Sequence, residues 1–432
     1  MVASAQQLRV EGVYEQKDAG FFMMRVKIPG GVLSSEQAFK ICEVAERFGR
    51  QTVHLTTRNS IEFHWLPADG LAEANRMLAS VGLTTRGACG GAVRGITCST
   101  ATLGAYPQVQ ALARKIHQHF TQNPHFEGLP KKFKVCVEAG YEGARHLIQD
   151  TGIVFAGLVE GEPRYDVWVA GGLGKEPVPA FLLEDGVSEG RVFALLEAVV
   201  AVYKAGASPG KRLKHLVAGI GRVEFVGLLA PRLEAVPSLE IRDGFAKSLT
   251  PEAGEDTSFV EARVFAGELA TTGLRRLASI GLEYTRGWLL VTPDQNLAFR
   301  LKGDRAAALE QELADAGFRD GSREERVKFR VCPGNHECRM GLGPTRDITR
   351  QVIARMCGAG EGLGWAISGC PNSCAQPQLA DVGIIIAKLP KDEKGERSPL
   401  FDLYRRTGET LGAVMHSDLT LDQLLEAVAV IS

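Results

Sequence analysis

The sequence predicts an α+β fold that is internally duplicated. Residues 21–83 read as strand, helix, strand and helix, and residues 259–318 repeat that order. Within these stretches VHLTTRNSIEFHW (53–65) aligns with LLVTPDQNLAFRL (289–301). The alignment places Thr56 at the position of Thr292 and Phe63 at the position of Phe299. A strand-rich block follows each copy. We therefore expect ferredoxin-like half-repeats and two α/β blocks related by a pseudo-two-fold axis. Chance recurrence of a common βαβα pattern is the alternative.

The first copy contains four expected elements. MMRVKI predicts a strand over 23–28, and SSEQAFKICEVAERFG predicts a helix over 34–49. TVHLTTRNSIEFHWL predicts a single second strand over 52–66, and LAEANRMLASVGL predicts a second helix over 71–83. This order corresponds to half of a split βαβ sheet.

The second copy follows the same plan. VEARVF predicts a strand over 260–265, and TTGLRRLASIG predicts a helix over 271–281. GWLLVTPDQNLAFRL predicts one strand over 287–301, and RAAALEQELADAGF predicts a helix over 305–318. The two copies and the blocks that follow them divide the chain into four predicted segments. These are half-repeat A (1–85), block B (86–245), half-repeat A′ (246–322) and block B′ (323–432).

Composition limits the class of protein. The chain has 432 residues with 45% hydrophobic and 23% charged residues, values typical of a globular protein with a sizeable core. Its formal net charge of -1 offers no basic field to attract nucleic acid. No apolar run approaches the roughly 20 residues that span a bilayer. The N-terminus has no apolar signal-peptide core, so we predict a cytoplasmic protein without a nucleic-acid or membrane partner.

Four cysteines form two close pairs. Cys332 and Cys338 are separated by five residues, and Cys370 and Cys374 by three. The nine cysteines are an odd number in a long chain without a secretion signal, which makes a disulfide framework a poor explanation. Four thiolates from two short loops suit an iron–sulfur cluster, a tetrahedral zinc ion, or no ligand at all, and the spacing alone leaves all three open.

Two prolines accompany these pairs. Pro333 and Pro371 each follow the first cysteine of a pair. Proline suits the first turn of a helix, because the missing N–H would be unpaired there anyway. We therefore expect a helix to begin at each proline, with backbone N–H groups that donate to cluster sulfurs.

SGCPNSCAQPQLADVG (368–383), which follows CPGNHEC (332–338), closely resembles the cluster and siroheme signature of sulfite and nitrite reductases. The resemblance implies that Cys332, Cys338, Cys370 and Cys374 hold a [4Fe–4S] cluster. It also implies that Cys374 bridges the cluster to the iron of siroheme, so that the two cofactors act as one electronic unit.

The resemblance covers most of the chain. FFMMRVKIPGG, LTTRNSIEFHW, GGAVRGITC and PKKFKV occur in the family order ahead of the cysteines. It implies substrate-binding cations on the open face of the siroheme, namely Arg25, Arg94, Lys132 and Lys134. It further implies contacts to siroheme carboxylates or its periphery from Arg58, His64 and Lys131, and from Gln295 and Asn296 on the pseudo-symmetric side.

Two residues depart from the family pattern. Glu62 stands where sulfite reductases usually have glutamine, and Gly95 replaces the usual asparagine after the arginine. A carboxylate near the carboxylates of siroheme is repulsive unless it is protonated or turned away.

The implied reaction is the six-electron reduction of sulfite to sulfide, with reduction of nitrite to ammonia as the alternative. Lys134 favours sulfite, because nitrite reductases tend to have asparagine there and the more highly charged anion gains more from a cation. The chain has no flavin or NADPH fingerprint, so we expect ferredoxin or a flavoprotein as an external donor. A related precorrin oxygenase and a non-enzymatic iron–sulfur or zinc protein are the remaining alternatives.

Overall fold

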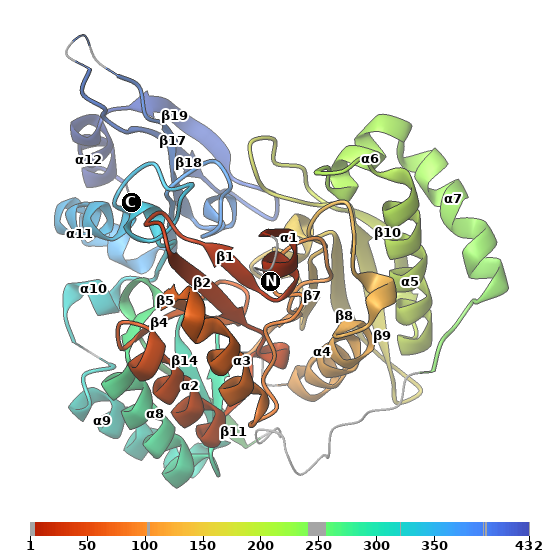
Figure 1. Cartoon of the computed structure of the whole chain (residues 1–432), viewed down its shortest axis with the longest axis horizontal. Helices are drawn as coiled ribbons and strands as arrows, with labels where there is room; N and C mark the ends of the chain where they lie inside the picture. The colour runs from red at the N-terminus through yellow and green to blue at the C-terminus, as the bar shows by residue number, and fades with distance from the viewer. Residues whose placement is uncertain are drawn as a thin grey trace.

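A computed structural model describes residues 5–101, 104–240, 256–319, 321–391, 393 and 395–431. The predicted fold class is confirmed: strands and helices mix throughout, and the described strands form four sheets. Figure 1 shows two lobes, block B′ in blue at the upper left and block B in yellow and green at the right, with the half-repeats below and between them. None of the described helices combines the length and the apolar character needed to cross a membrane.

Half-repeats A and A′ contain equivalent elements. In A the elements are α1 (Ala5–Val10), β1 (Val13–Glu15), β2 (Phe21–Val26), β3 (Val32–Ser34), α2 (Ser35–Phe48), β4 (Thr52–Leu55), β5 (Ile61–Pro67) and α3 (Leu71–Ala79). In A′ they are β11 (Thr257–Ala262), β12 (Glu268–Ala270), α8 (Thr271–Tyr284), β13 (Trp288–Val291), β14 (Leu297–Lys302) and α9 (Ala306–Asp315). The duplication therefore extends from β2 and β11 onward.

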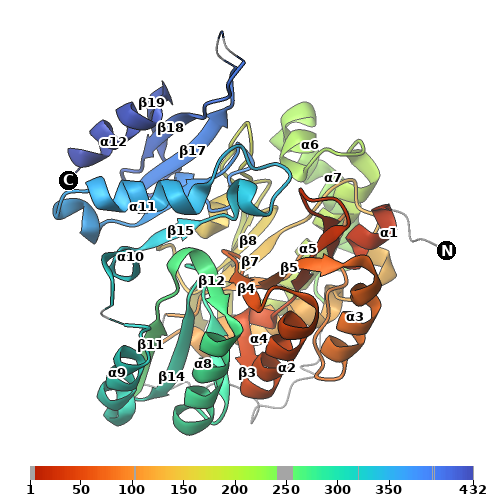
Figure 2. The same cartoon turned by 60° about the vertical axis from the view of Figure 1, so that its left-hand side comes forward.

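The central helices illustrate why these segments fold as they do. Ser34 caps α2 by accepting from the backbone N–H of Gln37 at 3.1 Å, and the Gln37 side chain accepts from the backbone N–H of Ser34 in return. The apolar face of α2 enters one core with residues of α8, and the two helices lie side by side (Figure 2). The two half-repeats thus share a single hydrophobic core.

The predicted single strands over 52–66 and 287–301 are wrong. Each stretch is a hairpin, β4–β5 in the first copy and β13–β14 in the second. Asn59 and Gln295 lie at the turns with φ of 50° and 65°, which breaks the strand. The sequence conceals the turns because Thr56 and Thr292 resemble strand residues, whereas their hydroxyls in fact accept turn N–H groups.

The two half-repeats exchange strands. β3 of A pairs antiparallel with β13 of A′, and β12 of A′ pairs antiparallel with β4 of A. The resulting sheets have the orders β1-β2-β5-β4-β12 and β11-β14-β13-β3. Because each sheet ends with a strand from the other copy, neither half-repeat completes its own sheet.

The side-chain amides of the two turns, one in each half-repeat, stabilise the strand exchange. Asn59 Nδ2 donates to Val291 O at 2.6 Å, and Gln295 Nε2 donates to Leu55 O at 3.0 Å. Leu55 and Val291 are the last residues of the equivalent strands β4 and β13. Each copy therefore holds the strand end of the other through one buried amide. We call these reciprocal contacts the amide clamps.

Each clamp also holds an α/β block. Asn59 accepts from Cys98 N at 3.3 Å and donates to Cys98 O at 3.4 Å. Gln295 accepts from Val331 N at 2.7 Å and donates to Val331 O at 2.9 Å. Cys98 ends the first strand of block B, and Val331 ends the first strand of block B′. The clamps therefore set how each block sits on the half-repeats.

Close backbone approach at the clamps requires glycine. Gly31 and Gly267 have φ of 81° and 69°, a region that favours glycine. A Cβ at Gly31 would lie 2.5 Å from Val291 O, and one at Gly267 would lie 2.5 Å from Leu55 O. Each glycine is therefore required at the equivalent place in its half-repeat, where the backbone packs against the strand end of the other copy.

The two α/β blocks share one topology. Block B contains β6 (Thr97–Cys98), α4 (Tyr106–Phe120), β7 (Val135–Glu138), β8 (Thr151–Val159), β9 (Glu162–Val169), β10 (Phe181–Val187), α5 (Glu189–Gly206), α6 (Leu213–Ile220) and α7 (Arg222–Ala235). After α10 (Arg323–Arg326), block B′ contains β15 (Phe329–Val331), α11 (Thr345–Arg355), β16 (Trp365–Ser368), β17 (Val382–Lys388), β18 (Leu400–Arg405), β19 (Ala413–Leu419) and α12 (Leu421–Ala429). In both sheets the first two strand pairs are parallel and the next two antiparallel.

The predicted segment limits at 85 and 322 remain predictions, and strand exchange joins A and A′ into shared sheets. The limit between residues 245 and 246 lies outside the described residues.

Removing one amide clamp should destabilise the fold. We expect Gln295→Ala to lower the free energy of unfolding by about 3 kcal/mol, because Leu55 O and both backbone groups of Val331 lose a buried partner. Chemical denaturation would measure the change. The matched control is Gln311→Ala, which removes an exposed bond to Asp315 and should cost less than about 0.5 kcal/mol. Equal losses for the two variants would contradict a structural role for the clamp.

Candidate functional site

The two cysteine pairs meet at one edge of block B′. Cys332 directly follows β15, and Cys370 lies two residues beyond β16. β15 and β16 are adjacent and parallel, so the loops at their carboxyl ends are neighbours. The backbone N–H of Gly369 donates to Cys332 Sγ at 3.1 Å, which joins the loops directly. The structure therefore brings the predicted cluster cysteines together.

The thiols influence one another. Burial and, second, the nearby Cys374 raise the pKa of Cys370 to about 11. Burial first and Cys374 second also raise the pKa of Cys332, and burial raises that of Cys338. Iron ions would reverse this tendency, since a coordinating thiol is deprotonated by the metal's charge. The four sulfurs thus form a site that suits a cation.

Among the described residues, no three side chains of histidine, cysteine, aspartate or glutamate converge closely enough to hold one metal ion.

The two prolines behave differently. Pro333 precedes a short 3-10 helix, Gly334–His336, as expected. A helix starting at Pro371 was expected but is not formed, because Pro371 lies in a turn that brings Cys374 back towards the loop of Cys332. The backbone N–H of Asn372 still donates to the sulfur of Cys370 from the turn itself.

The turn of half-repeat A rests against the second cysteine loop. Thr57 Oγ1 donates to Cys374 O at 2.9 Å, and Gln376 Nε2 donates to Thr57 O at 3.4 Å. Arg58 follows Thr57, so this contact places the predicted basic residue of the turn beside the loop that carries Cys374.

Arg25 and Arg94 meet at one carbonyl. Both guanidinium groups donate to Ala88 O, and Arg94 also donates to Gly90 O at 3.0 Å. Arg94 is only 7% exposed, yet its Nε has no hydrogen-bond partner among the described residues. A buried guanidinium with an unused donor is suited to an anionic group.

Lys132 and Lys134 lie near Cys374. Burial lowers the pKa of Lys132 to about 8, with Cys374 opposing the shift and Arg212 and Arg94 adding to it. Burial lowers the pKa of Lys134 well below its usual value, followed by repulsion from Lys132 and Arg58. In the part of the chain that the structure describes, neither ammonium group has a carboxylate partner. The lysines therefore form a crowded, uncompensated cationic surface opposite Cys374.

Arg58 lies beside these lysines, and its two terminal guanidinium nitrogens donate to the protein. It donates to Gln149 Oε1 at 2.9 Å and to Gly95 O at 2.7 Å. Burial lowers its pKa to about 9. Gly95, one of the two departures from the family pattern, thus contributes its carbonyl to this network.

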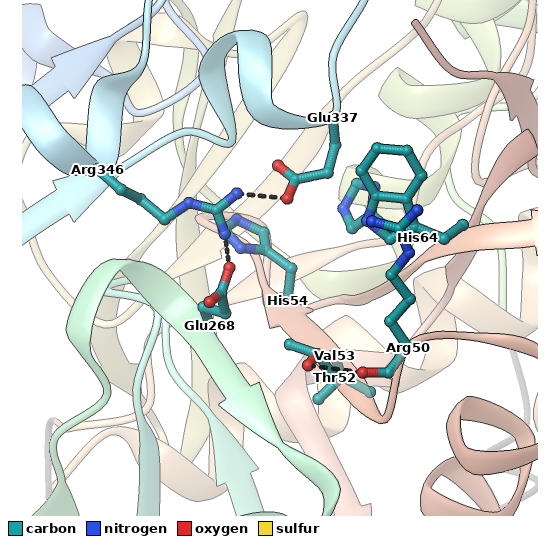
Figure 3. Close-up of a pocket in the computed structure, with 9 residues that line it drawn as sticks. Arg50, Thr52, Val53, His54, His64, Glu268, Glu337 and Arg346 are labelled. Carbon is teal, nitrogen blue, oxygen red and sulfur yellow. Dashed lines mark hydrogen bonds and ion pairs between the residues drawn. The ribbon is translucent and has the colours of Figure 1, made fainter. Parts of the chain in front are cut away.

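His64 lies on the other side of Glu62. Its Nε2 is 3.5 Å from Glu62 Oε2, and neither ring nitrogen has a hydrogen-bond partner among the described residues. His64 lines a cavity of about 190 Å³ (Figure 3), in which Arg346 reaches towards both Glu337 and Glu268. This cavity adjoins the first cysteine loop, because Glu337 precedes Cys338.

The remaining residues predicted to contact siroheme differ in whether their polar groups are already bonded within the protein. Lys131 is exposed at the edge of the cationic surface. Gln295 is committed to its clamp, and Asn296 accepts from the backbone N–H of Val264 at 2.8 Å. The structure thus gathers the predicted arginines and lysines near Cys374, but it uses the amides of Gln295 and Asn296 within the protein.

Sequence reasoning missed a buried ion pair behind the lysines. Arg212 Nη2 lies 2.7 Å from Asp150 Oδ2, and the Asp150 side chain is fully buried. The same oxygen accepts from the backbone N–H of Lys134 at 2.8 Å. The basic run Lys211-Arg212-Leu213-Lys214 is the signal that could have revealed Arg212.

Replacing a cluster cysteine should remove iron selectively. We expect Cys370→Ser to lose most of its iron and acid-labile sulfide, because one of four thiolate ligands disappears. Cys357→Ser is the matched control: Cys357 lies in the same block and donates to Ile431 O at 2.9 Å, away from the cysteine pairs. Iron and sulfide analysis of anaerobically purified protein measures both. Full iron in Cys370→Ser, or equal loss in Cys357→Ser, would contradict the assignment.

Comparison with known families agrees with this geometry. Residues 14–81 and 251–316 both match the family described as "Nitrite/Sulfite reductase ferredoxin-like half domain". Residues 87–236 match the "Nitrite and sulphite reductase 4Fe-4S domain". The first match falls once on each half-repeat and so confirms the duplication.

Similar proteins include ferredoxin–nitrite reductase of Synechococcus elongatus, which is 31% identical over 86% of this chain and 78% of its own length. A sulfite reductase [ferredoxin] of Mycobacterium tuberculosis is 25% identical over 85% of this chain and 70% of its own length. The sulfite reductase [NADPH] hemoprotein beta-component of Acidithiobacillus ferrooxidans is 26% identical over 99% of this chain and 83% of its own length.

The solved structure of the Mycobacterium tuberculosis NirA protein has the same fold, with a TM-score of 0.82 and 23% identity over 98% of this chain and 85% of that protein. The family matches and the relatives identify an oxidoreductase with siroheme and a [4Fe–4S] cluster as cofactors, in place of a non-enzymatic carrier. The chain belongs to the siroheme- and iron–sulfur-dependent sulfite and nitrite reductase family.

Proposed function

We propose that the protein catalyses the six-electron reduction of sulfite to sulfide. The observation that carries the proposal is the cationic surface opposite Cys374, where Lys132 and Lys134 lack carboxylate partners among the described residues. Such uncompensated charge attracts an oxyanion and stabilises the negative charge that electrons bring.

Siroheme, when bound, supplies an iron at which the anion is reduced, and the cluster supplies electrons singly. The protein's residues bind the anion and move protons. We assign Arg94 and Arg25 to orienting the oxyanion, since a guanidinium matches its oxygens. Lys132, whose pKa is about 8, can hold a proton near neutral pH and release it to a departing oxygen. We assign the same role to Lys134.

We propose that Cys332, Cys338, Cys370 and Cys374 ligate the cluster and that Cys374 bridges it to siroheme. Arg58, His64 and Lys131 are proposed to contact siroheme carboxylates or its periphery. His64 Nδ1, which has no hydrogen-bond partner among the described residues, and the exposed ammonium of Lys131 support this assignment. Gln295 and Asn296 keep their amides within the protein, so we limit their proposed role to lining the pocket.

We propose reduced ferredoxin as the electron donor, as named for several relatives, with a flavoprotein as the alternative suggested by the NADPH-dependent relative. Cys338 is exposed, which gives a donor a short path to the cluster. We further propose a cytoplasmic location.

Reduction of nitrite to ammonia is the second candidate. The relative with 31% identity is a nitrite reductase. In addition, Glu62 pairs with Arg25 and removes one positive charge from the site, which suits a monoanion. A turnover assay with reduced ferredoxin and each anion, with sulfide and ammonia measured as products, tests both candidates. Reduction of neither anion by protein that contains both cofactors would refute the proposed function.

Substitution of Lys134 should change KM for sulfite more than KM for nitrite. We expect Lys134→Asn to raise KM for sulfite about tenfold and KM for nitrite about threefold, because loss of a cation weakens binding of a dianion more. Steady-state kinetics at mildly alkaline pH measures both constants. Lys115→Asn, which breaks a peripheral pair with Glu189, is the control and should change neither. Equal changes in both constants for Lys134→Asn would contradict the charge argument.

A further inference from the structure

Glu62 lies at the centre of the first half-repeat's sheet. Its strand neighbours are Arg25 on β2 and His54 on β4, directly opposite on either side. The residue is 6% exposed. A carboxylate in such a position must be paired, because an isolated buried charge is costly.

Arg25 provides the pairing. Its Nε donates to Glu62 Oε1 at 2.7 Å, and its Nη2 lies 2.5 Å from the same oxygen. Burial opposes ionisation, but Arg25, and then His64, hold the pKa of Glu62 well below its usual value. Glu62 is therefore an ionised partner of Arg25.

The pair changes what Arg25 offers to a substrate. The remaining guanidinium nitrogen, Nη1, donates to Ala88 O at 3.2 Å and lies 3.6 Å from Cys89 Sγ. Within the described residues, Arg25 is the one cation of the four assigned to substrate that has a carboxylate partner. The local charge of the site is thus one unit lower than its arginines and lysines alone imply.

We propose that Glu62 is a specificity-determining residue that cancels the charge of Arg25 and so tunes the anion site for monoanions: nitrite, and sulfite in its protonated form. This inference rests on the proposed function and deepens it. A negative charge repels a dianion about twice as strongly as a monoanion at the same distance. Glu62 therefore weakens binding of the sulfite dianion more than binding of nitrite.

Glu62→Gln tests the inference, because glutamine keeps the size and the oxygen that accepts from Arg25 while removing the charge. The holoenzyme is titrated with sulfite and with nitrite at mildly alkaline pH, and the shift of the siroheme absorption bands gives both dissociation constants. We expect the constant for sulfite to fall about tenfold and that for nitrite about threefold, since the dianion feels twice the change in free energy.

Glu261→Gln is the matched control. Glu261 lies on β11 of the second half-repeat and pairs with Ala298 on β14. This pair is equivalent to Arg25 on β2 and Glu62 on β5 in the first half-repeat. It accepts from Thr292 Oγ1 at 3.2 Å and pairs with none of the four assigned cations. The same chemical change there should leave the ratio of the two dissociation constants unaltered.

The double variant Arg25→Gln/Glu62→Gln separates charge from structure. It removes both members of the pair and so restores the net charge of the native site, even where affinity falls overall. The ratio of sulfite to nitrite constants should return towards the native value. If the glutamine variant does not retain siroheme, Glu62→Leu carries the same expectation for the ratio.

An unchanged ratio in Glu62→Gln, or a ratio in the double variant equal to that in Glu62→Gln, would overturn the inference. The proposed function would survive that outcome if the native enzyme still reduced either anion. Conversely, failure of the native holoenzyme to reduce both anions would refute the proposed function itself.

Discussion

The reciprocal amide clamps are the constraint on which the rest of the structure depends. Asn59 and Gln295 each hold the strand end of the other half-repeat and the first strand of one α/β block. Together with the exchanged strands β3 and β12, they make the two copies a single unit. Since both amides sit in tight turns with positive φ, a small local feature sets the relative placement of the two lobes.

Blocks B and B′ have the same topology but contribute different residues to the candidate site. In block B′ the chemistry-bearing cysteines follow the carboxyl ends of β15 and β16. In block B the cations precede the amino ends of β6 and β7, where Arg94 and Lys134 lie. Lys132 and Lys134 at this edge of block B interact with Cys374 of block B′, so the candidate site lies between the copies. Crowding of cations there is costly without an anion, and siroheme carboxylates and an oxyanion relieve it.

Much of this arrangement was predictable from the sequence, and the failures have physical reasons. The duplication and the cysteine pairs are local patterns with fixed spacing, and both predictions agree with the fold. The hairpins were missed because Thr56 and Thr292 are as suitable for a strand as for a turn. Asp150 was missed because its importance comes from tertiary contacts with Lys134 and Arg212 that no local pattern encodes. The state of Glu62 depended on a partner on a neighbouring strand.

The central claim is that the cations of one repeat and the cysteines of the other enclose one site, in which an oxyanion binds next to siroheme. The most direct measurement is the absorption spectrum of anaerobically purified holoprotein during titration with sulfite. We predict siroheme bands together with cluster absorbance, and a saturable shift of the siroheme bands as sulfite is added. Siroheme bands that neither sulfite nor nitrite displaces at millimolar concentration would contradict the claim.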